Sequence, residues 1–429
     1  MKANMGEQMH EWAQKLYPIC RSITGPGVRE TLNFIKDIMP DLEIKELASG
    51  TNTFDWVVPD EWQVNKAYIT DEQGKVIVDY KVHNLHLVGY SIPIDVWMTL
   101  DELMPHLHSL PSRSNAIPYV TSYYARNWGF CLTHNQLKSL KQGKYHVVIS
   151  SELKPGVLNY GELILPGSST QEVFISTYVC HPSMGNNELS GPVVATALAS
   201  FINSLANRRY TYRFIFIPET IGSIAYLSMH HKVLKEKVVA GFNLTCVGDD
   251  RTFSFLPSLY GDTIADRLAK YTLNSHKINF TEYSFLSRGS DERQYCWPGI
   301  DLPVVSIMRS KYGTYPEYHT SEDDLSLITP EGLWGALQIH INCVNTLENN
   351  EVYVNRVLCE PNLGKRNLYP TTSTLKNKQY SRDLIDFMVY CDGERCLLDI
   401  AIILNKPIDH ILKLVEELIR NELIEKKPD

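Results

Sequence analysis

The chain has 429 residues, of which 44% are hydrophobic and 21% are charged, and its formal net charge is −8 at pH 7. This length predicts two or three domains, and the near-average composition excludes a largely disordered chain. The excess of acidic residues argues against broad, non-specific binding to nucleic acid.

The N-terminal segment, MKANMGEQMHEWAQKLYPIC, lacks the continuous apolar core of a signal peptide. No run of about 18 apolar residues, the length that spans a membrane, occurs in the sequence. The nine cysteines are scattered and never form a CxxC pair, which is typical of reduced thiols rather than of disulfides. We therefore expect a cytoplasmic protein with no membrane partner.

Residues 6–40 show the spacing of two helices separated by a turn. Trp12 and Leu16 recur at helical intervals, the turn SITGPG follows, and a second apolar set begins at Leu32. From about Asp41 to Gly167 the pattern changes to short alternating runs such as KVIVDY and YHVVISSEL, broken by Gly, Pro, Asn and Asp. This region is predicted to be an inserted β-rich domain, with one helical stretch near DVWMTLDELMPHLHSL.

Strands and helices alternate from Glu172 onward. The predicted strands include EVFISTYV, YRFIFIP, VAGFNLTCV and LPVVSIM, and the predicted helices include SGPVVATALASFINSL, SIAYLSMHH and a long one from Pro330 to about Asn349. Such alternation is typical of a mostly parallel sheet that is covered by helices on both faces. Ligands bind such sheets at the carboxyl ends of the strands.

The last part of the chain predicts a linker and a small third domain. Residues 352–374 are rich in Asn, Pro and Gly, and residues 375–429 contain three short helical patterns with the size and order of a winged helix. From Ser381 to Asp429 there are seven Lys/Arg and eleven Asp/Glu, a difference of −4. Because a DNA-recognition helix needs a basic face, we expect this domain to pack or to contact protein rather than nucleic acid.

Three polar side chains follow three separate strands of the predicted sheet. His181 comes directly after the strand EVFISTYVC, Glu219 follows YRFIFIP, and His319 follows LPVVSIM after a loop. A single histidine is more often structural than functional, but the carboxyl ends of parallel strands meet at one edge of a sheet. We therefore expect the three side chains to share one crevice.

Several segments resemble the aminopeptidase-like proteins of the zinc-exopeptidase superfamily. They are CHPSMGNNELSG, PETIGS, GSDERQYC, YHTSEDD, LYPICRSITGPGVRETL and TSYYARNWGFC, and they are spread over nearly the whole chain. The resemblance implies a peptidase-like α/β core in residues 1–40 and 168–351, a protease-associated-like insertion in residues 41–167 and a C-terminal winged helix. Some members are labelled as polysaccharide-biosynthesis proteins, which points to a pathway without fixing a reaction.

The resemblance also implies a chemistry. In the superfamily one or two Zn²⁺ ions polarise the scissile carbonyl and acidify a bound water, and a glutamate removes the proton of that water. His181 matches the first ligand histidine, His319 matches the last, and Glu219 resembles the general base of the EExG pattern. The resemblance therefore implies a zinc hydrolase with these three residues at its centre.

Three ligand positions of the superfamily carry other residue types here, and they are Asn187, Thr220 and Thr245. The second glutamate of the EExG pattern is Thr220, and the aspartate that bridges two metal ions is Asn187. Asn187 is a candidate ligand through its oxygen, but a neutral side chain does not offset the repulsion between two close cations. We therefore expect one zinc ion rather than two, with an empty site as the alternative.

Nearby carboxylates are candidate replacements for the missing ligands. Asp249 or Asp250 could replace the aspartate expected at Thr245, and Glu188 could replace Asn187. The resemblance gives a supporting or pocket-lining role to acidic residues in the segment GSDER, which are Asp291 and Glu292. Tyr318, beside His319, either lines the pocket wall or packs in its loop.

Two function hypotheses follow. The first is a metal-dependent hydrolase that cleaves an amide bond near the free amino group of a small peptide or an aminoacylated metabolite. Glu219 favours it, because an inactive pocket has no need for a carboxylate at that strand end. The alternative is a binding or scaffold protein that keeps the peptidase fold with lost or altered chemistry, linked through its relatives to polysaccharide biosynthesis. Whether the chain forms a homo-oligomer stays open.

Overall fold

The computed structural model describes residues 2–368 and 375–427. The end of the predicted linker, residues 369–374, and the last two residues of the predicted winged helix lie outside the described residues. The chain divides into two compact units, Met1–Asp266 with Phe280–Gln338 and Arg267–Asn279 with Ile339–Asp429. Among the helices that the structure describes, none has the length and apolarity needed to cross a bilayer.

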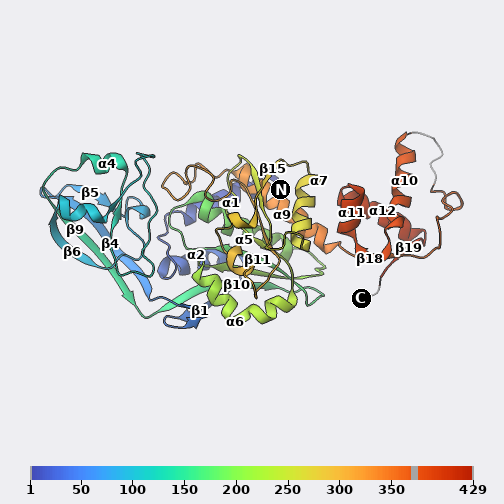
Figure 1. The fold of residues 1–429 in the computed structure, drawn as a ribbon, viewed down its shortest axis with the longest axis horizontal. Helices are drawn as coiled ribbons and strands as arrows, with labels where there is room; N and C mark the ends of the chain where they lie inside the picture. Colours follow the sequence, from blue (N-terminus) through green and yellow to red (C-terminus); the bar gives the residue numbers. More distant parts are fainter. Residues whose placement is uncertain (1, 369–374, 428–429) are drawn as a thin grey trace. The chain divides into compact units, whose positions relative to one another are not determined.

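The first unit is built around an eight-stranded mixed sheet that is flanked by helices (Figure 1). Its strand order is β1-β10-β12-β11-β13-β16-β14-β15. The four central strands run parallel, and they are β12 (Thr211–Ile217), β11 (Glu172–Tyr178), β13 (Val238–Asn243) and β16 (Val304–Met308). β11 is buried at every position, so both of its faces are covered. The predicted α/β architecture is therefore confirmed.

The outer strands of this sheet revise the predicted boundaries of the insertion. β1 (Glu43–Ala48) pairs antiparallel with β10 (Val157–Leu165), and β10 pairs antiparallel with the central strand β12. Both strands fall inside the range predicted for the inserted domain, residues 41–167, because an alternating pattern indicates a strand without showing which sheet it joins. At the other edge, β14 (Phe253–Leu256) and β15 (Phe280–Glu282) complete the sheet.

Helices follow most of the central strands, as the alternation predicted. A short π-helical turn, η3 (Gly185–Leu189), leads directly into α5 (Ser190–Asn203), and α6 (Ile221–Lys237) starts four residues after β12 ends. The first unit also contains α1 (Lys2–Leu16) and α2 (Pro26–Ile38), while α7 (Ile264–Ser275) lies mostly in the second unit and α9 (Pro330–Glu348) is divided between the two. The turns at the starts of η3 and α6 lie at the carboxyl ends of β11 and β12.

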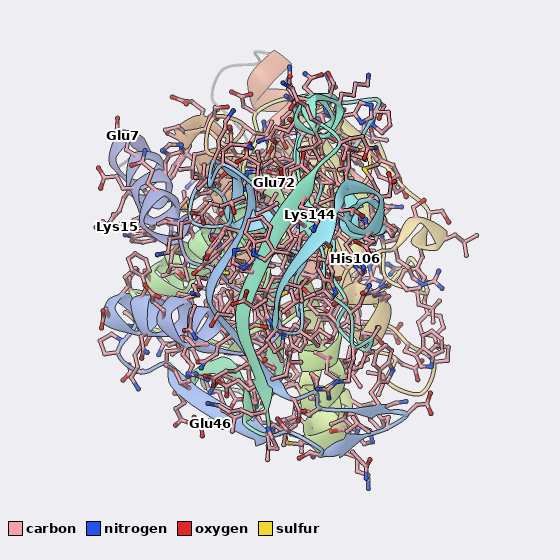
Figure 2. The ribbon with its side chains drawn as sticks, turned by 90° about the vertical axis from the view of Figure 1, so that its left-hand side faces the viewer. Glu7, Lys15, Glu46, Glu72, His106 and Lys144 are labelled. Atoms are coloured by element: carbon pink, nitrogen blue, oxygen red, sulfur yellow. The ribbon has the colours of Figure 1, made fainter. Side chains whose placement is uncertain are left out.

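The inserted domain contains a four-stranded antiparallel sheet in the order β5-β4-β9-β6. Its strands are β4 (Glu61–Asp71), β5 (Val76–Asp79), β6 (Ile94–Thr99) and β9 (Lys144–Lys154). Figure 2 faces this domain and labels Lys144, where β9 begins. The helical stretch predicted near residues 95–110 is wrong for its first part, because Ile94–Thr99 pairs with β9 as a strand. Its helical part consists of α3 (Leu100–Leu103) and the 3-10 helix η2 (Met104–His106). Two short strand pairs also fall in this range of the chain: β2 (Asn52–Thr53) with β3 (Trp56–Val57), and β7 (Leu107–His108) with β8 (Phe130–Cys131).

The second unit contains the predicted winged helix. Three helices, α10 (Leu375–Val389), α11 (Leu397–Leu404) and α12 (Ile408–Arg420), accompany a three-stranded sheet of β17 (Val352–Asn355), β18 (Asp392–Cys396) and β19 (Ile424–Lys426). α12 buries one apolar face, formed by Ile411, Leu414, Val415 and Leu418. The predicted linker therefore starts too early, because β17 pairs with both other strands of this sheet.

Candidate active site

His181 lies just beyond the carboxyl end of β11, and a buried carboxylate holds its imidazole. The backbone N–H of His181 donates to Oε2 of Glu188 at 3.0 Å, and Nδ1 lies 2.9 Å from the same oxygen. Glu188 comes from the π-helical turn η3. A carboxylate at Nδ1 requires the proton there, so Nε2 is the ring nitrogen that can serve a ligand.

The charge state of His181 is set by its buried neighbours. Burial opposes a charge on the ring, but the Glu188 carboxylate at Nδ1 outweighs it and raises the pKa of His181 well above its ordinary value. A metal ion that binds Nε2 displaces the second proton of the ring. Metal affinity at this position is therefore expected to depend on pH.

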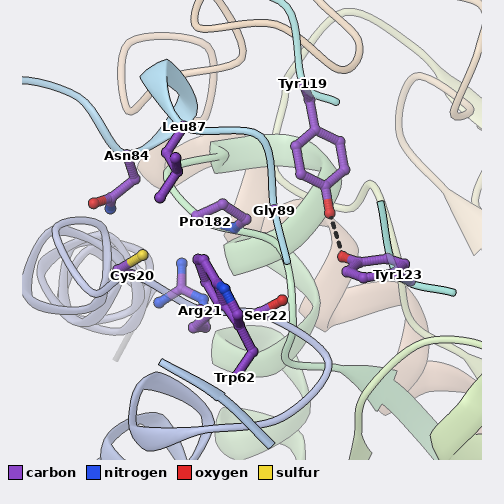
Figure 3. Close-up of a pocket in the computed structure, with 10 residues that line it drawn as sticks. All are labelled: Cys20, Arg21, Ser22, Trp62, Asn84, Leu87, Gly89, Tyr119, Tyr123 and Pro182. Atoms are coloured by element: carbon purple, nitrogen blue, oxygen red, sulfur yellow. Dashed lines mark hydrogen bonds between the residues drawn. The ribbon is translucent and has the colours of Figure 1, made fainter. Parts of the chain in front are cut away.

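Arg21 contacts both His181 and Glu188 on the buried side of the site. Its Nε donates to the carbonyl oxygen of His181 at 2.9 Å and lies 3.6 Å from Oε1 of Glu188, and neither charged side chain is exposed. Figure 3 shows Arg21 beside Ser22 and Trp62, at a cavity of about 10 Å³ that is too small for a substrate. Sequence reasoning missed Arg21, because nothing in its local pattern shows that it is buried against a residue so far along the chain.

Glu219 approaches the outward side of the same imidazole. It follows Pro218 at the end of β12, and its Oε2 lies 3.6 Å from Nε2 of His181, with 20% of the side chain exposed. Its backbone N–H donates to Sγ of Cys180 at 3.2 Å, which fixes this strand end against the neighbouring one. Burial raises the pKa of Glu219, although His181 and Arg293 act in the opposite direction. A carboxylate whose pKa is raised is suited to accept a proton near neutral pH.

His319 completes the group. Its ring centroid lies 5.6 Å from that of His181, and its ring stacks on Tyr318 at 3.9 Å. Burial and the neighbouring His181 lower the pKa of His319 to about 3, so its imidazole is neutral under ordinary conditions. His319 has φ of 56°, a conformation that costs a non-glycine residue on the order of 1 kcal/mol or more. The structure thus brings together the three residues that follow the strand ends.

The inserted domain contributes an aromatic wall to this site. The backbone N–H of Tyr119 donates to the carbonyl oxygen of His319 at 2.9 Å, and its ring centroid lies 5.2 Å from those of both His181 and His319. The hydroxyls of Tyr119 and Tyr123 are 2.7 Å apart, as Figure 3 shows. Sequence reasoning missed Tyr119, although the segment TSYYARNWGFC, which begins two residues later, carried part of the family resemblance.

Two of the predicted metal ligands are engaged elsewhere. The side-chain oxygen of Asn187 accepts a hydrogen bond from the hydroxyl of Tyr178 at 3.2 Å. The carboxylate of Asp249 accepts hydrogen bonds from the backbone N–H and the hydroxyl of Ser310, at 2.8 and 2.9 Å, and from the amide of Asn186 at 3.0 Å. Across the described part of the chain, no hydrogen bond or ion pair joins Asp249 to His181 or His319. Its contacts are those of a residue that fixes the loop after β13.

The two acidic residues of the GSDER segment, Asp291 and Glu292, accept hydrogen bonds from the loops around the site. Oδ1 of Asp291 accepts from the backbone N–H of Thr220 and from the hydroxyl of Ser223, both at 2.8 Å. Burial, together with the nearby Glu219, raises the pKa of Asp291 to about 7. The carboxylate of Glu292 accepts four hydrogen bonds, from the N–H groups of Gly289 and Ser290, the hydroxyl of Tyr312 and the amide of Asn243. These contacts support the loops around Glu219 and leave Glu292 with little capacity for a ligand.

The donor atoms present fit one metal ion better than two. Cys180, His181 and Glu188 offer donor atoms within 4.8 Å of one another, a partial metal-binding cluster. However, burial raises the pKa of Cys180 to about 11, so its thiol stays protonated, and Glu188 already takes Nδ1 of His181. The opposite side of the ring offers Nε2 beside a carboxylate and a second, neutral imidazole that has no hydrogen-bond partner within the described residues. Imidazole nitrogens are common ligands of Zn²⁺, and a carboxylate beside them is placed to accept a proton from a bound water.

The chain is similar to known proteins over nearly its whole length. A family described as "Domain of unknown function (DUF4910)" matches residues 10–350, and a winged helix-turn-helix family matches residues 351–426. A protein of Clostridium acetobutylicum, named as a candidate polysaccharide biosynthesis protein with an aminopeptidase-like domain, is 41% identical over 421 residues. The match covers 98% of this chain and 96% of that protein.

Solved structures agree with this similarity. A crystal structure of a candidate peptidase from Clostridium acetobutylicum has a TM-score of 0.93 at 40% identity, covering 99% of this chain and 97% of that one. The structure of BSAP, a zinc aminopeptidase from Bacillus subtilis, has a TM-score of 0.59 at 12% identity, covering 80% of this chain and 94% of that one. At this lower identity the second likeness shows a shared fold and nothing more.

Proposed function

Because the chain belongs to the DUF4910 family and shares its fold with zinc aminopeptidases, we propose that it is a metal-dependent hydrolase of aminopeptidase type. Its substrate would carry an amide bond near a free amino group, in a peptide or an aminoacylated metabolite. The observation that carries the proposal is the convergence of His181, Glu219 and His319 from three strand ends. The polysaccharide pathway in the name of the Clostridium relative favours an aminoacylated metabolite over a peptide.

A single zinc ion would be held by Nε2 of His181 and by His319. When bound, such an ion supplies a Lewis acid that polarises the scissile carbonyl and makes a bound water more acidic. The neutral imidazole of His319 and the fixed orientation of His181 support this assignment. A second ion receives no support, because Asn187 carries no charge and Thr220 stands where a second carboxylate ligand is expected.

The protein's own groups divide the remaining work. Glu219 accepts a proton from the attacking water and returns it to the leaving amine, for which its raised pKa suits it. Glu188 and Arg21 keep the imidazole of His181 in one orientation. Tyr119 and Tyr318 pack around His319 and reduce the access of bulk water to it.

One observation favours the alternative, a binding or scaffold protein with the peptidase fold. The amide of Asn187 is used within the protein, by the hydroxyl of Tyr178 and the sulfur of Met184, instead of facing a ligand. A chain that has lost its ligand carboxylates in this way could retain the cleft for binding alone. The acidic winged helix then serves assembly with protein, which we propose in either case over contact with nucleic acid.

Metal analysis of the full-length protein separates these two functions. Protein purified without chelator is expected to contain about one zinc ion per chain, and the His181→Ala, His319→Ala double variant is expected to contain none. A Tyr124→Ala variant, altered at an exposed side chain of the inserted domain, serves as the matched control. Wild-type protein that holds no metal and releases no amine from aminoacyl-amide substrates would point to the scaffold.

A further inference from the structure

Arg293 is a charged side chain next to the proposed base for which the hydrolase mechanism has no role. It lies in the short helix α8 (Glu292–Tyr295), and its Nη2 donates a hydrogen bond to the hydroxyl of Thr220. Thr220 directly follows Glu219 and has φ of 65°, so the strand end that presents Glu219 also anchors the guanidinium. The positive charge of Arg293 acts on Glu219, whose pKa it helps to lower against the effect of burial.

The guanidinium has no acidic partner. Among the residues that the structure describes, no carboxylate forms an ion pair with Arg293, and its Nε is buried without a hydrogen bond. The two acidic residues before it in the chain are turned to other donors, Asp291 to Thr220 and Ser223, and Glu292 to four groups of its own loop. One of the five N–H groups of the guanidinium is therefore used, by a neutral hydroxyl.

An arginine without a carboxylate partner is suited to bind an anion. Guanidinium keeps its charge at any ordinary pH, and its planar fork matches the paired oxygens of a carboxylate or a phosphate. Holding such a charge partly out of water without a carboxylate in direct contact is unfavourable, and an incoming anion offsets that cost.

A groove of about 630 Å³, within the range of small-molecule sites, runs along α6. Gln294, which follows Arg293 in the chain, lines this groove, whereas Arg293 itself is not among its lining residues. Ile224, one turn beyond Thr220, also lines the groove. The side chains of Phe54 and Trp297 border the groove and are each 57% exposed, so they offer flat apolar faces to whatever binds there.

We propose that Arg293 is a specificity residue that binds a carboxylate or phosphate group of the ligand, and so that the substrate is anionic. The nature of the cleaved bond, an amide, is taken from the proposed function. Binding of the anion to Arg293 requires neither a metal ion nor turnover. The proposal names the class of substrate that the hydrolase assignment leaves open: an amide that also carries an anionic group within reach of Arg293.

Calorimetric titration of the full-length protein with two probes, inorganic phosphate and glutarate, tests this proposal. A chelator is present throughout, so that no bound metal ion contributes to anion binding. Wild-type protein is expected to bind one or both probes, and Arg293→Gln to bind them about tenfold more weakly or worse. Arg293→Lys keeps the charge but loses the fork, so the affinity for glutarate is expected to fall more than that for phosphate.

The control is Arg288→Gln, which alters an arginine of the same loop that contacts Phe285 and not Thr220. Its affinity for both probes is expected to equal that of the wild type, and thermal unfolding checks that each variant is folded.

The stronger of the two wild-type affinities tells whether the anion is a phosphate or a carboxylate. The proposal is overturned if wild-type protein binds neither probe at millimolar concentration, or if Arg293→Gln or, where that variant does not fold, Arg293→Lys binds both as tightly as wild type. Because zinc content and amide hydrolysis are measured separately, failure of the hydrolase assignment leaves a positive titration standing.

Discussion

Oε2 of Glu188 lies 2.9 Å from Nδ1 of His181, and Oε2 of Glu219 lies 3.6 Å from Nε2 on the other side of the same ring. The imidazole is thus held from behind by one carboxylate and faced by a second, which has a partly exposed side chain. The first contact fixes the orientation of the ring, and the second places a proton acceptor where a ligand can reach it. The two carboxylates are therefore expected to respond differently to substitution.

Glu188→Gln is expected to lower the free energy of unfolding by about 3 kcal/mol, because it leaves the buried guanidinium of Arg21 without its counter-charge. Denaturant titration of both proteins measures the difference. Glu317→Gln is the matched control, since it breaks an ion pair with Arg251, whose side chain is 46% exposed. That change is expected to cost about 1 kcal/mol or less. Equal losses in the two variants would show that the Arg21–Glu188 pair has no special role.

Glu219→Gln is expected to lower kcat about a hundredfold or more while the zinc content stays unchanged. Glutamine keeps the size of the side chain but does not accept the proton of the attacking water. Kinetics with an aminoacyl-amide substrate and metal analysis of the same preparation provide the two readouts. A variant that loses its zinc together with its activity would instead identify Glu219 as a metal ligand.

The ends of the central strands could be predicted from the sequence because each strand is a short, mostly apolar run that is followed by polar residues. The positions of His181, Glu219 and His319 after three of these strands were sufficient to predict that they meet. The contacts of Arg21 and Tyr119 were not predictable in this way, because each depends on how segments distant in sequence pack against the histidines.

The limits of pattern analysis appear equally in the fold. β1 and β10 have the alternation of the inserted domain and yet join the large sheet. The composition of residues 352–374 predicts a linker, yet β17 in this range pairs within the winged helix. In both cases the local sequence specifies an extended segment, whereas its hydrogen-bond partner is decided by tertiary structure. The role of Asp249 is likewise decided by tertiary structure, because its carboxylate accepts a hydrogen bond from the hydroxyl of Ser310.

Asp291→Asn is expected to stabilise the protein at pH 8 and to have little effect near pH 4. The folded-state pKa of Asp291, about 7, lies above its unfolded value, so the folded state holds a proton that the unfolded state has lost. This group therefore stabilises the fold at low pH, and that contribution disappears as pH rises from about 4 to about 7. The gain at pH 8 is expected to be on the order of a few kcal/mol, and denaturant titration at both pH values measures it. A variant equally destabilised at pH 4 and pH 8 would mean that Asp291 acts only through its hydrogen bonds.

Tyr119→Ala is expected to lower zinc affinity and kcat/KM by about tenfold or more, although Tyr119 belongs to the inserted domain. Its ring packs against both imidazoles, and its segment carries the backbone hydrogen bond that holds His319 in a strained conformation. Removal of the ring leaves space in which His319 can relax to an ordinary φ and turn away from His181. Zinc titration with a competing chelator and steady-state kinetics give the two values. Tyr124→Ala is the control, because this tyrosine is 57% exposed and contacts Trp56 instead of the histidines. Should both variants behave like wild type, the inserted domain would have no part in shaping the metal site.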